Sequence, residues 1–145
     1  MHRVLRADRA AVYRALTDPA AIARWRFPDG MTSLIEPGGD GGFRVTLTYE
    51  SADEQGKTTG HSDTYRGRFT ELIPGERVVE VDEFETTDPR FAGAMTMTIT
   101  LHEHGDGIEL TAVHEGVPDG IRPEDNELGW RMALDRLAAL VEPRV

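Results

Sequence analysis

A chain of 145 residues is long enough for one domain that buries about two-thirds of its unfolded surface, and residues 1–145 are treated as a single domain. The formal net charge of −10, with Lys57 as the only lysine, repels phosphate backbones and argues against a nucleic-acid partner. No cysteine is present, which excludes disulfides, and no segment approaches the ~20 apolar residues of a membrane span. We therefore expect a soluble cytoplasmic protein with no membrane partner.

The chain begins with two short predicted helices. Asp8 is a typical N-cap residue for a helix over residues 9–16. Asp18 and Pro19 then end that helix and begin a second one, which runs through Trp25. Both helices precede the strands that alternation of apolar and polar residues predicts.

From residue 31 onward apolar and polar residues alternate, which is the period of a half-buried strand. Six such runs are predicted as strands: residues 31–36, 43–49, 65–73, 77–84, 95–102 and 108–115. Glycine-rich turns separate most of them, which favours an antiparallel meander. The polar segment 51–61 is predicted as a solvated turn, with a mobile tip over a cavity mouth as the alternative.

The segment Pro123–Val141 is predicted as one long amphipathic helix. Pro123 suits the first helical turn, and the apolar face opens with Trp130 and Met132 and continues with Leu134. A twisted sheet must cover its apolar face, and this is the only predicted element long enough to do so. The sequence therefore predicts an α+β fold in which a curved antiparallel sheet wraps around the C-terminal helix.

Several short motifs follow one another along nearly the whole chain: Leu16-Thr17-Asp18-Pro19, Arg24-Trp25, Gly41-Gly42-Phe43, residues 67–72, residues 76–79 and Gly129-Trp130. Together they resemble the START-related helix-grip (SRPBCC) superfamily, and within it the branch named after activators of the 90-kDa heat-shock protein ATPase. The resemblance implies a helix-grip fold with a further strand at the N-terminus, formed by residues 2–6, and so a sheet of six to seven strands. It also implies a cavity between sheet and helix, where family members hold lipids, sterols, polyketides or hormones.

Aromatic and methionine side chains would line such a cavity if they point inward. A wall of this kind suits a small apolar or amphipathic molecule. The candidate lining residues are Trp25, Phe43, Tyr49, Tyr65, Phe69, Met95, Met97, Leu110, His114, Trp130 and Leu134. The alternative for each of them is ordinary core packing without a usable void.

Three polar residues are candidates for proton transfer in this cavity. The parity of its strand places His114 on the inward face if that face is the apolar one. In residues 77–84 both parities carry apolar residues, so the pattern leaves open whether Glu80 and Asp82 face inward, although the family pattern favours them. Two carboxyl groups and an imidazole in an apolar pocket can exchange protons. The alternative is solvated acids and a structural histidine.

Metal and cofactor sites are not expected. His102 and His104 share a strand face, but zinc needs three or four ligands, and His61 and Glu109 have no diagnostic spacing. The sequence also contains no phosphate-binding loop, dinucleotide fingerprint or nucleophile elbow.

Three functions remain open. The leading hypothesis is a non-enzymatic domain that binds a small hydrophobic or amphipathic ligand. The second is an enzyme of the polyketide cyclase or dehydratase type that uses His114 with Glu80 or Asp82. The third is a co-chaperone-like module that presents its acidic surface to a basic partner such as a chaperone. The sequence is also compatible with a homodimer.

Overall fold

The computed structural model describes residues 1–27, 31–38, 42–49 and 62–143, except for the side chain of Tyr49. Within these residues the elements follow one another as β1 (His2–Leu5), α1 (Arg9–Thr17), α2 (Pro19–Trp25), β2 (Met31–Pro37), β3 (Phe43–Tyr49), β4 (Ser62–Ile73), β5 (Arg77–Phe84), β6 (Ala94–His104), β7 (Gly107–Glu115) and α3 (Pro123–Val141).

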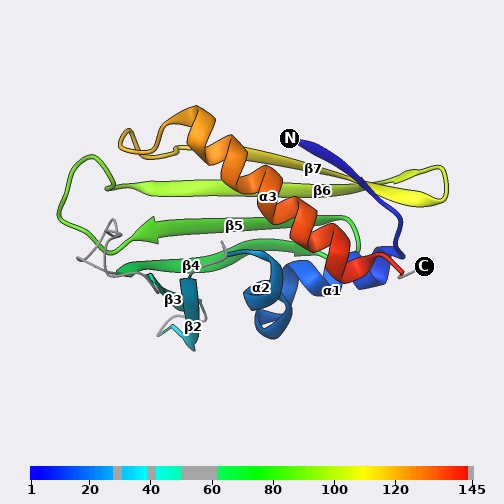
Figure 1. Cartoon of the computed structure of the whole chain (residues 1–145), viewed down its shortest axis with the longest axis horizontal. Coiled ribbons are helices and arrows are strands. Elements are labelled where there is room, and N and C mark those ends of the chain that lie inside the picture. Colours follow the sequence, from blue (N-terminus) through cyan, green and yellow to red (C-terminus); the bar gives the residue numbers. More distant parts are fainter. Residues whose placement is uncertain (28–30, 39–41, 50–61, 144–145) are drawn as a thin grey trace.

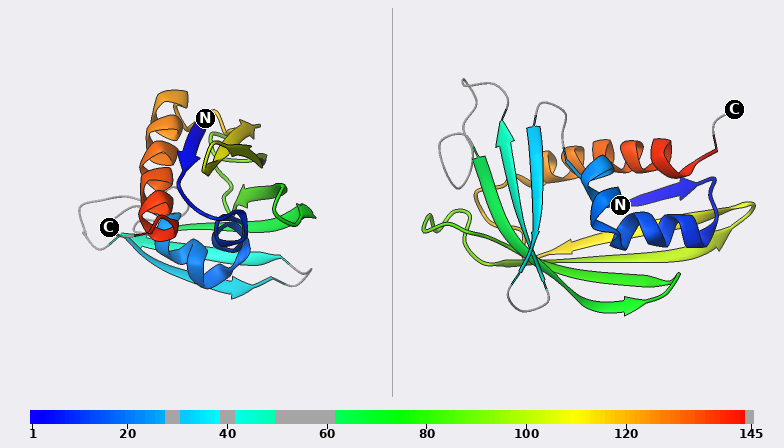
Figure 2. Two further views of the ribbon diagram at one scale, coloured as in Figure 1. Left: turned by 90° about the vertical axis from the view of Figure 1, so that its right-hand side faces the viewer. Right: turned by 90° about the horizontal axis from the view of Figure 1, so that it is seen from below.

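The strands form one antiparallel sheet with the order β1-β7-β6-β5-β4-β3-β2 in the described part of the chain. From β2 to β7 each strand pairs with the next one in the sequence, and β1 is added at the far edge beside β7. The sheet is strongly curved, and α3 crosses its concave side (Figures 1 and 2). The helices α1 and α2 contact each other and also pack against α3.

The apolar core lies between the concave face of the sheet and the second half of α3. Leu134 and Leu137 of α3 are buried in one cluster with Leu5 of β1, Ile99 of β6 and Leu110 of β7. Each buried side chain of this size contributes about 1.5–3 kcal/mol relative to an exposed one. This packing holds the C-terminal half of the helix firmly on the sheet.

The ends of the helices follow the sequence signals in part. Pro123 stands in the first turn of α3. Asp18 caps α2, since its carboxylate accepts a hydrogen bond of 3.1 Å from the backbone N–H of Ala20. Asp8 occupies the N-cap position of α1, as predicted, although its side chain makes no capping hydrogen bond.

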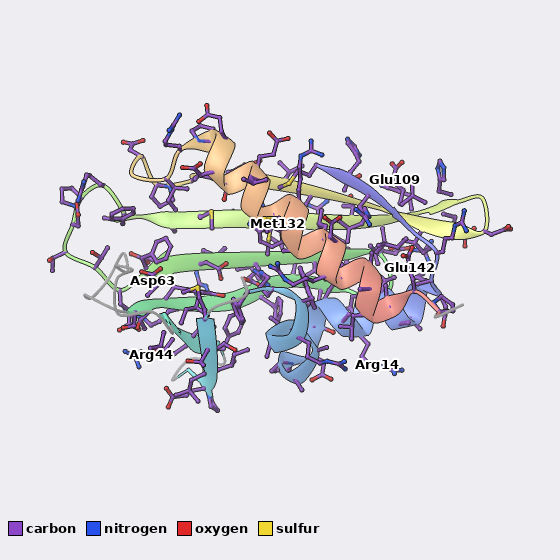
Figure 3. All side chains as sticks on the ribbon, in the orientation of Figure 1. Arg14, Arg44, Asp63, Glu109, Met132 and Glu142 are labelled. Carbon is purple, nitrogen blue, oxygen red and sulfur yellow. The ribbon has the colours of Figure 1, made fainter. Side chains whose placement is uncertain are left out.

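The predicted fold class is confirmed, and the bounds of α3 agree with the prediction. One detail of α3 is wrong: Met132 is half exposed rather than part of the apolar face (Figure 3). Two residues correspond to about 200° around a helix, so Met132 lies nearly opposite Trp130. The prediction for residues 51–61 concerns a segment outside the described residues.

Candidate functional site

A cavity of about 390 Å³ lies beside the first half of α3, between this helix, the concave face of the sheet and the end of α2. Most of its wall is apolar. The lining residues are Arg26, Phe27, Met31, Leu47, Asp63, Tyr65, Asp82, Glu83, Phe84, Gly93, Met95, Pro118, Ile121, Asp125, Asn126, Gly129, Trp130, Ala133 and Arg136.

The strand register explains how the sheet builds its side of the cavity. Directly opposite residues on neighbouring strands share a face. Tyr65 of β4 stands opposite Phe84 of β5, and Asp82 of β5 stands opposite Met95 of β6. Asp63, labelled in Figure 3, adds a carboxyl group to the same face of β4. The sheet therefore presents aromatic and thioether groups with carboxyl groups between them.

A buried group of one arginine and two carboxyl residues lies at this wall, and two of its members, Arg26 and Asp82, line the cavity. We call Arg26, Glu80 and Asp82 the Arg26 cluster. The Nη2 atom of Arg26 donates a 2.6 Å hydrogen bond to Oε2 of Glu80 and lies 3.7 Å from Oδ2 of Asp82. The exposed fractions of the three side chains are 6%, 1% and 10%. Solvent screening of these charges is therefore weak.

Both tryptophans of the chain flank the same guanidinium. The carbon Cζ of Arg26 lies 4.9 Å from the ring centroid of Trp130 and 5.5 Å from that of Trp25. The rings meet edge to face, with centroids 6.1 Å apart. Trp25 is fixed by a 2.8 Å hydrogen bond from Nε1 to the carbonyl of Ala15. The cation is thus held by cation–π contacts as well as by the ion pair.

The protonation states follow from this burial. Burial raises the pKa of Asp82 well above its ordinary value, and the charge and hydrogen bond of Glu80 raise it further, whereas Arg26 lowers it. The raised pKa favours the protonated form of Asp82. Burial alone would lower the pKa of Arg26, but Glu80, Tyr65 and Asp82 raise it on balance. Burial also raises the pKa of Tyr65.

Gly67 makes room for the carboxyl group of Asp82. A Cβ atom at position 67 would lie 2.4 Å from Oδ1 of Asp82 and 2.6 Å from the ring of Phe43, so no side chain fits there without displacement. Among the described residues, Oδ1 of Asp82 has no hydrogen-bond partner. A buried acceptor without a donor is costly, and this oxygen is packed over Gly67 with almost no accessible surface, so the folded protein bears that cost.

His114 packs against the ring of Trp130, which also contacts the guanidinium of Arg26. The ring centroids of His114 and Trp130 are 4.7 Å apart, and Asn126 lies 2.9 Å from Nδ1 of the histidine. Burial and the charge of Arg26 lower the pKa of His114 to about 4. The imidazole is therefore neutral at physiological pH, with its Nδ1 accepting from the Asn126 amide.

Three of the sequence-predicted lining residues border the cavity: Tyr65, Met95 and Trp130. The other predicted residues whose side chains are described lie outside its lining: Trp25, Phe43, Phe69, Met97, Leu110, His114 and Leu134. Of these, Trp25, Met97, Leu110 and Leu134 belong to the buried core, and Phe69 packs against it. The side chain of Tyr49 is outside the described residues. A ligand-binding role for Tyr49 and for the residues outside the lining stays a prediction.

The structure places Glu80 and Asp82 on the concave face, as the family pattern suggested. Proton transfer would require the two carboxyl groups to lie close to the imidazole of His114. Met97 stands between Glu80 and His114 in the register, and no hydrogen bond or ion pair joins the imidazole to either carboxyl group among the described residues. The proton-transfer hypothesis for these three residues stays a prediction.

Sequence reasoning missed Arg26, Asp63, Gly129 and Arg136. One signal for Arg26 was available: two carboxyl groups that share the inward face of a strand need a buried cation, and Arg24 and Arg26 were the arginines next to Trp25. The remaining three carry no local signal, because the curvature of the sheet and the position of α3 decide which residues border the cavity.

The described residues contain no group of three or more histidine and acidic side chains that could hold a metal ion. His102 and His104 are exposed on β6, and Nδ1 of His104 lies 4.0 Å from a carboxylate oxygen of Glu109. In the same part of the chain, no helix has the length and apolar character needed to cross a bilayer.

A curved antiparallel sheet that holds a C-terminal helix beside a pocket defines an SRPBCC-type protein. Residues 6–142 match the family model described as "Activator of Hsp90 ATPase homolog 1-like protein". The chain therefore belongs to this family, which is of a type known for ligand binding. No curated protein matches the sequence.

Solved structures agree with this assignment. Protein CV1439 from Chromobacterium violaceum is 37% identical, with a TM-score of 0.83, and the match covers 99% of this chain and 96% of that one. A protein from Rhodobacter sphaeroides is 20% identical, with a TM-score of 0.73 and coverage of 97% and 89%. A protein from Rhizobium loti is 24% identical, with a TM-score of 0.68 and coverage of 97% and 94%. The latter two show the fold alone.

Proposed function

We propose that the protein binds a small hydrophobic or amphipathic molecule in the cavity between the sheet and α3. The observation that carries this proposal is the cavity itself, whose volume of about 390 Å³ falls within the range of about 300–1,000 Å³ typical of ligand pockets. Its apolar walls and few buried polar groups are the usual composition of such pockets.

An energy estimate supports a ligand with some polar character. Burial of ~300 Å² of apolar ligand surface contributes roughly 7 kcal/mol at about 25 cal/mol per Å². Association costs at least ~4 kcal/mol, so apolar contact alone leaves an affinity near the millimolar range. Tighter binding requires hydrogen bonds from the polar residues of the wall.

Gly129 offers a direct test of the site. Gly129 lines the cavity at an exposed position of α3, and a Cβ atom built there meets no atom within 4 Å, so a larger side chain has free space at the cavity's edge. We expect Gly129→Leu to reduce the affinity for the uncharged dye N-phenyl-1-naphthylamine by at least about tenfold, because the cavity is filled. Ala139→Leu, at an exposed position of α3 outside the lining, is the matched control and should bind as the wild type does.

Dye fluorescence and calorimetry with fatty alcohols, fatty acids and sterols measure this binding. If the wild type binds none of these molecules below millimolar concentration, or if the Gly129→Leu and Ala139→Leu variants bind equally well, the proposed site is wrong. Far-UV circular dichroism shows whether both variants are folded.

A further inference from the structure

Arg26 and Arg136 are the arginines among the described lining residues of the cavity, and they differ in how far their N–H groups are already used. Both Nη atoms of Arg26 donate to the carboxylate of Glu80. The ring centroids of Trp25 and Trp130 lie within 5.5 Å of its guanidinium carbon. Because its side chain is only 6% exposed, Arg26 has little free surface to offer to a ligand.

Arg136 uses only its Nε atom to hold the fold. This atom donates a 2.9 Å hydrogen bond to the backbone carbonyl of Trp25, the last residue of α2. Carbonyl groups at the end of a helix lack partners within the helix, so the bond satisfies one of them. It fixes the guanidinium where α2 and α3 lie side by side (Figure 1).

The two Nη atoms of Arg136 remain available. They make no hydrogen bond or ion pair with any residue that the structure describes. They are also not among the inaccessible polar atoms without a partner, in contrast to Oδ1 of Asp82. Because Arg136 lines the cavity, these N–H groups can be reached by a molecule inside it.

The face of α3 that borders the cavity carries its charges at the two ends. Asp125, Gly129, Ala133 and Arg136 line the cavity and follow one another at intervals of three or four residues, so they form one stripe along the helix. The two residues in the middle of this stripe are small. Asp125 lies in the first turn, about 16 Å from Arg136 along the helix axis. This separation exceeds the ~8 Å over which exposed charges interact in physiological salt.

The other acidic residues of the lining leave Arg136 free as well. No carboxylate oxygen of the described residues lies within ion-pair distance of its guanidinium. Asp82 has one oxygen 3.7 Å from Arg26 and the other packed over Gly67. Glu83 follows Asp82 in β5, so its side chain points to the opposite, exposed face of the sheet.

We propose that the cavity binds an amphipathic carboxylate, and that Arg136 holds its anionic group. This inference rests on the proposed ligand-binding function. The two Nη atoms present parallel N–H groups that match the two oxygens of a carboxylate. A partly buried carboxylate needs such a partner, because burial of an unpaired charge is costly. The apolar body of the ligand lies along Ala133 and Gly129, against Trp130.

The first experiment uses the wild-type protein. Bound N-phenyl-1-naphthylamine is displaced by decanoate or by 1-decanol, which have the same number of carbon atoms. We expect decanoate to displace the dye at a concentration at least about tenfold lower, because hydrogen bonds to a charged group are stronger than those between neutral groups. Displacement by decanol at an equal or lower concentration would overturn the inference.

Two variants connect the preference to Arg136. Arg136→Gln removes the charge and the paired N–H groups, and we expect the ratio of the two displacing concentrations to fall to about one. Arg131→Gln removes the same charge from the exposed side of α3, outside the lining, and should leave the ratio as in the wild type. An unchanged ratio in Arg136→Gln, or an equal fall in both variants, would overturn the inference.

The hydrogen bond from Arg136 to Trp25 is also lost in Arg136→Gln, so the integrity of the cavity has to be checked. Binding of the uncharged dye without a competitor provides this check. If Arg136→Gln fails it, Arg136→Lys takes its place, because lysine keeps the charge without the paired N–H groups. The ratio should then fall between one and the wild-type value, and an unchanged ratio would overturn the inference.

The outcomes separate the two proposals. If the dye binds but neither decanoate nor decanol displaces it, the inference on Arg136 fails and the cavity remains a binding site. If neither the dye nor any tested lipid binds, the proposed function itself fails.

Discussion

Removal of the buried cation at Arg26 should strongly destabilise the protein. In Arg26→Met the side chain keeps much of its length, but Glu80 and Asp82 lose the only described cation within 4 Å of them. Breaking a buried ion pair from one side typically costs about 3–5 kcal/mol, because the remaining charge stays buried without a partner. With a urea dependence of about 1–3 kcal/mol per M, the unfolding midpoint should fall by roughly 2 M.

A double-mutant cycle distinguishes this effect from lost packing. We expect Arg26→Met combined with Glu80→Gln to be less destabilised than the sum of the single changes, by about 1–3 kcal/mol. Arg131→Met is the control, since its 2.8 Å ion pair with Glu127 lies on the exposed side of α3 and should contribute only about 0.2–0.5 kcal/mol. Additive single changes, or an Arg26 variant as stable as the control, would refute the reasoning.

Three further predictions use the same protein and the same assays. Gly129→Ala should stabilise α3 by about 0.5–1 kcal/mol, because glycine is unfavourable within a helix. The same variant should bind the dye more weakly. A lower melting temperature would mean that the space at Gly129 is not free. Burial lowers the pKa of His114 to about 4, so the folded state binds fewer protons than the unfolded state between pH 6.5 and 4, and stability is lost as the pH falls through this window. Urea titrations at each pH should show that His114→Gln loses less stability than the wild type between pH 6.5 and 4. An equal loss in both proteins would exclude His114 as the cause of this pH dependence. His102→Gln, at an exposed position of β6, serves as the control. Burial raises the pKa of Asp82, so the contribution of this residue to stability is fully present below pH 3.8 and is lost as the pH rises through the raised pKa. Asp82→Asn should flatten that part of the pH–stability profile. Parallel profiles of the variant and the wild type would contradict this prediction.

The fold could be predicted because its signals are local and repeated. Alternation of apolar and polar residues defined the strands, and the spacing of Trp130, Leu134 and Leu137 together with Pro123 defined α3. The first strand was predicted only from the family resemblance. Its sequence has no strong pattern, and it is held by pairing with β7, as between His2 and Thr111.

The candidate site could be predicted only in part. Tyr65, Met95 and Trp130 were identified because they are aromatic or thioether residues on the inward side of their strand or helix. Met97, Leu110 and Leu134 have the same parity or helix face, but they lie farther along the sheet, where α3 packs closely and leaves no space. Parity predicts which side a residue faces, whereas sheet curvature decides whether that side is filled or hollow.

The Arg26 cluster shows a second limit. Charged residues in a sequence are ordinarily read as solvated, and nothing in the residues around Arg26 marks it as buried. Its burial follows from the meeting of α2 with β5, which are more than fifty positions apart in the chain. Only the requirement that Glu80 and Asp82 find a positive partner would have indicated it.

The edge-to-face pair of Trp25 and Trp130 has a practical consequence for anyone working with this protein. These are the only tryptophans in the sequence, and both contact the same guanidinium beside the cavity. Near-ultraviolet circular dichroism is sensitive to the relative orientation of such rings, so its tryptophan bands should report on one small region rather than on the whole molecule. A guest that rotates the Trp130 indole would be visible without any label, and because Trp25 belongs to the buried core, loss of this signal on heating would report the loss of that core.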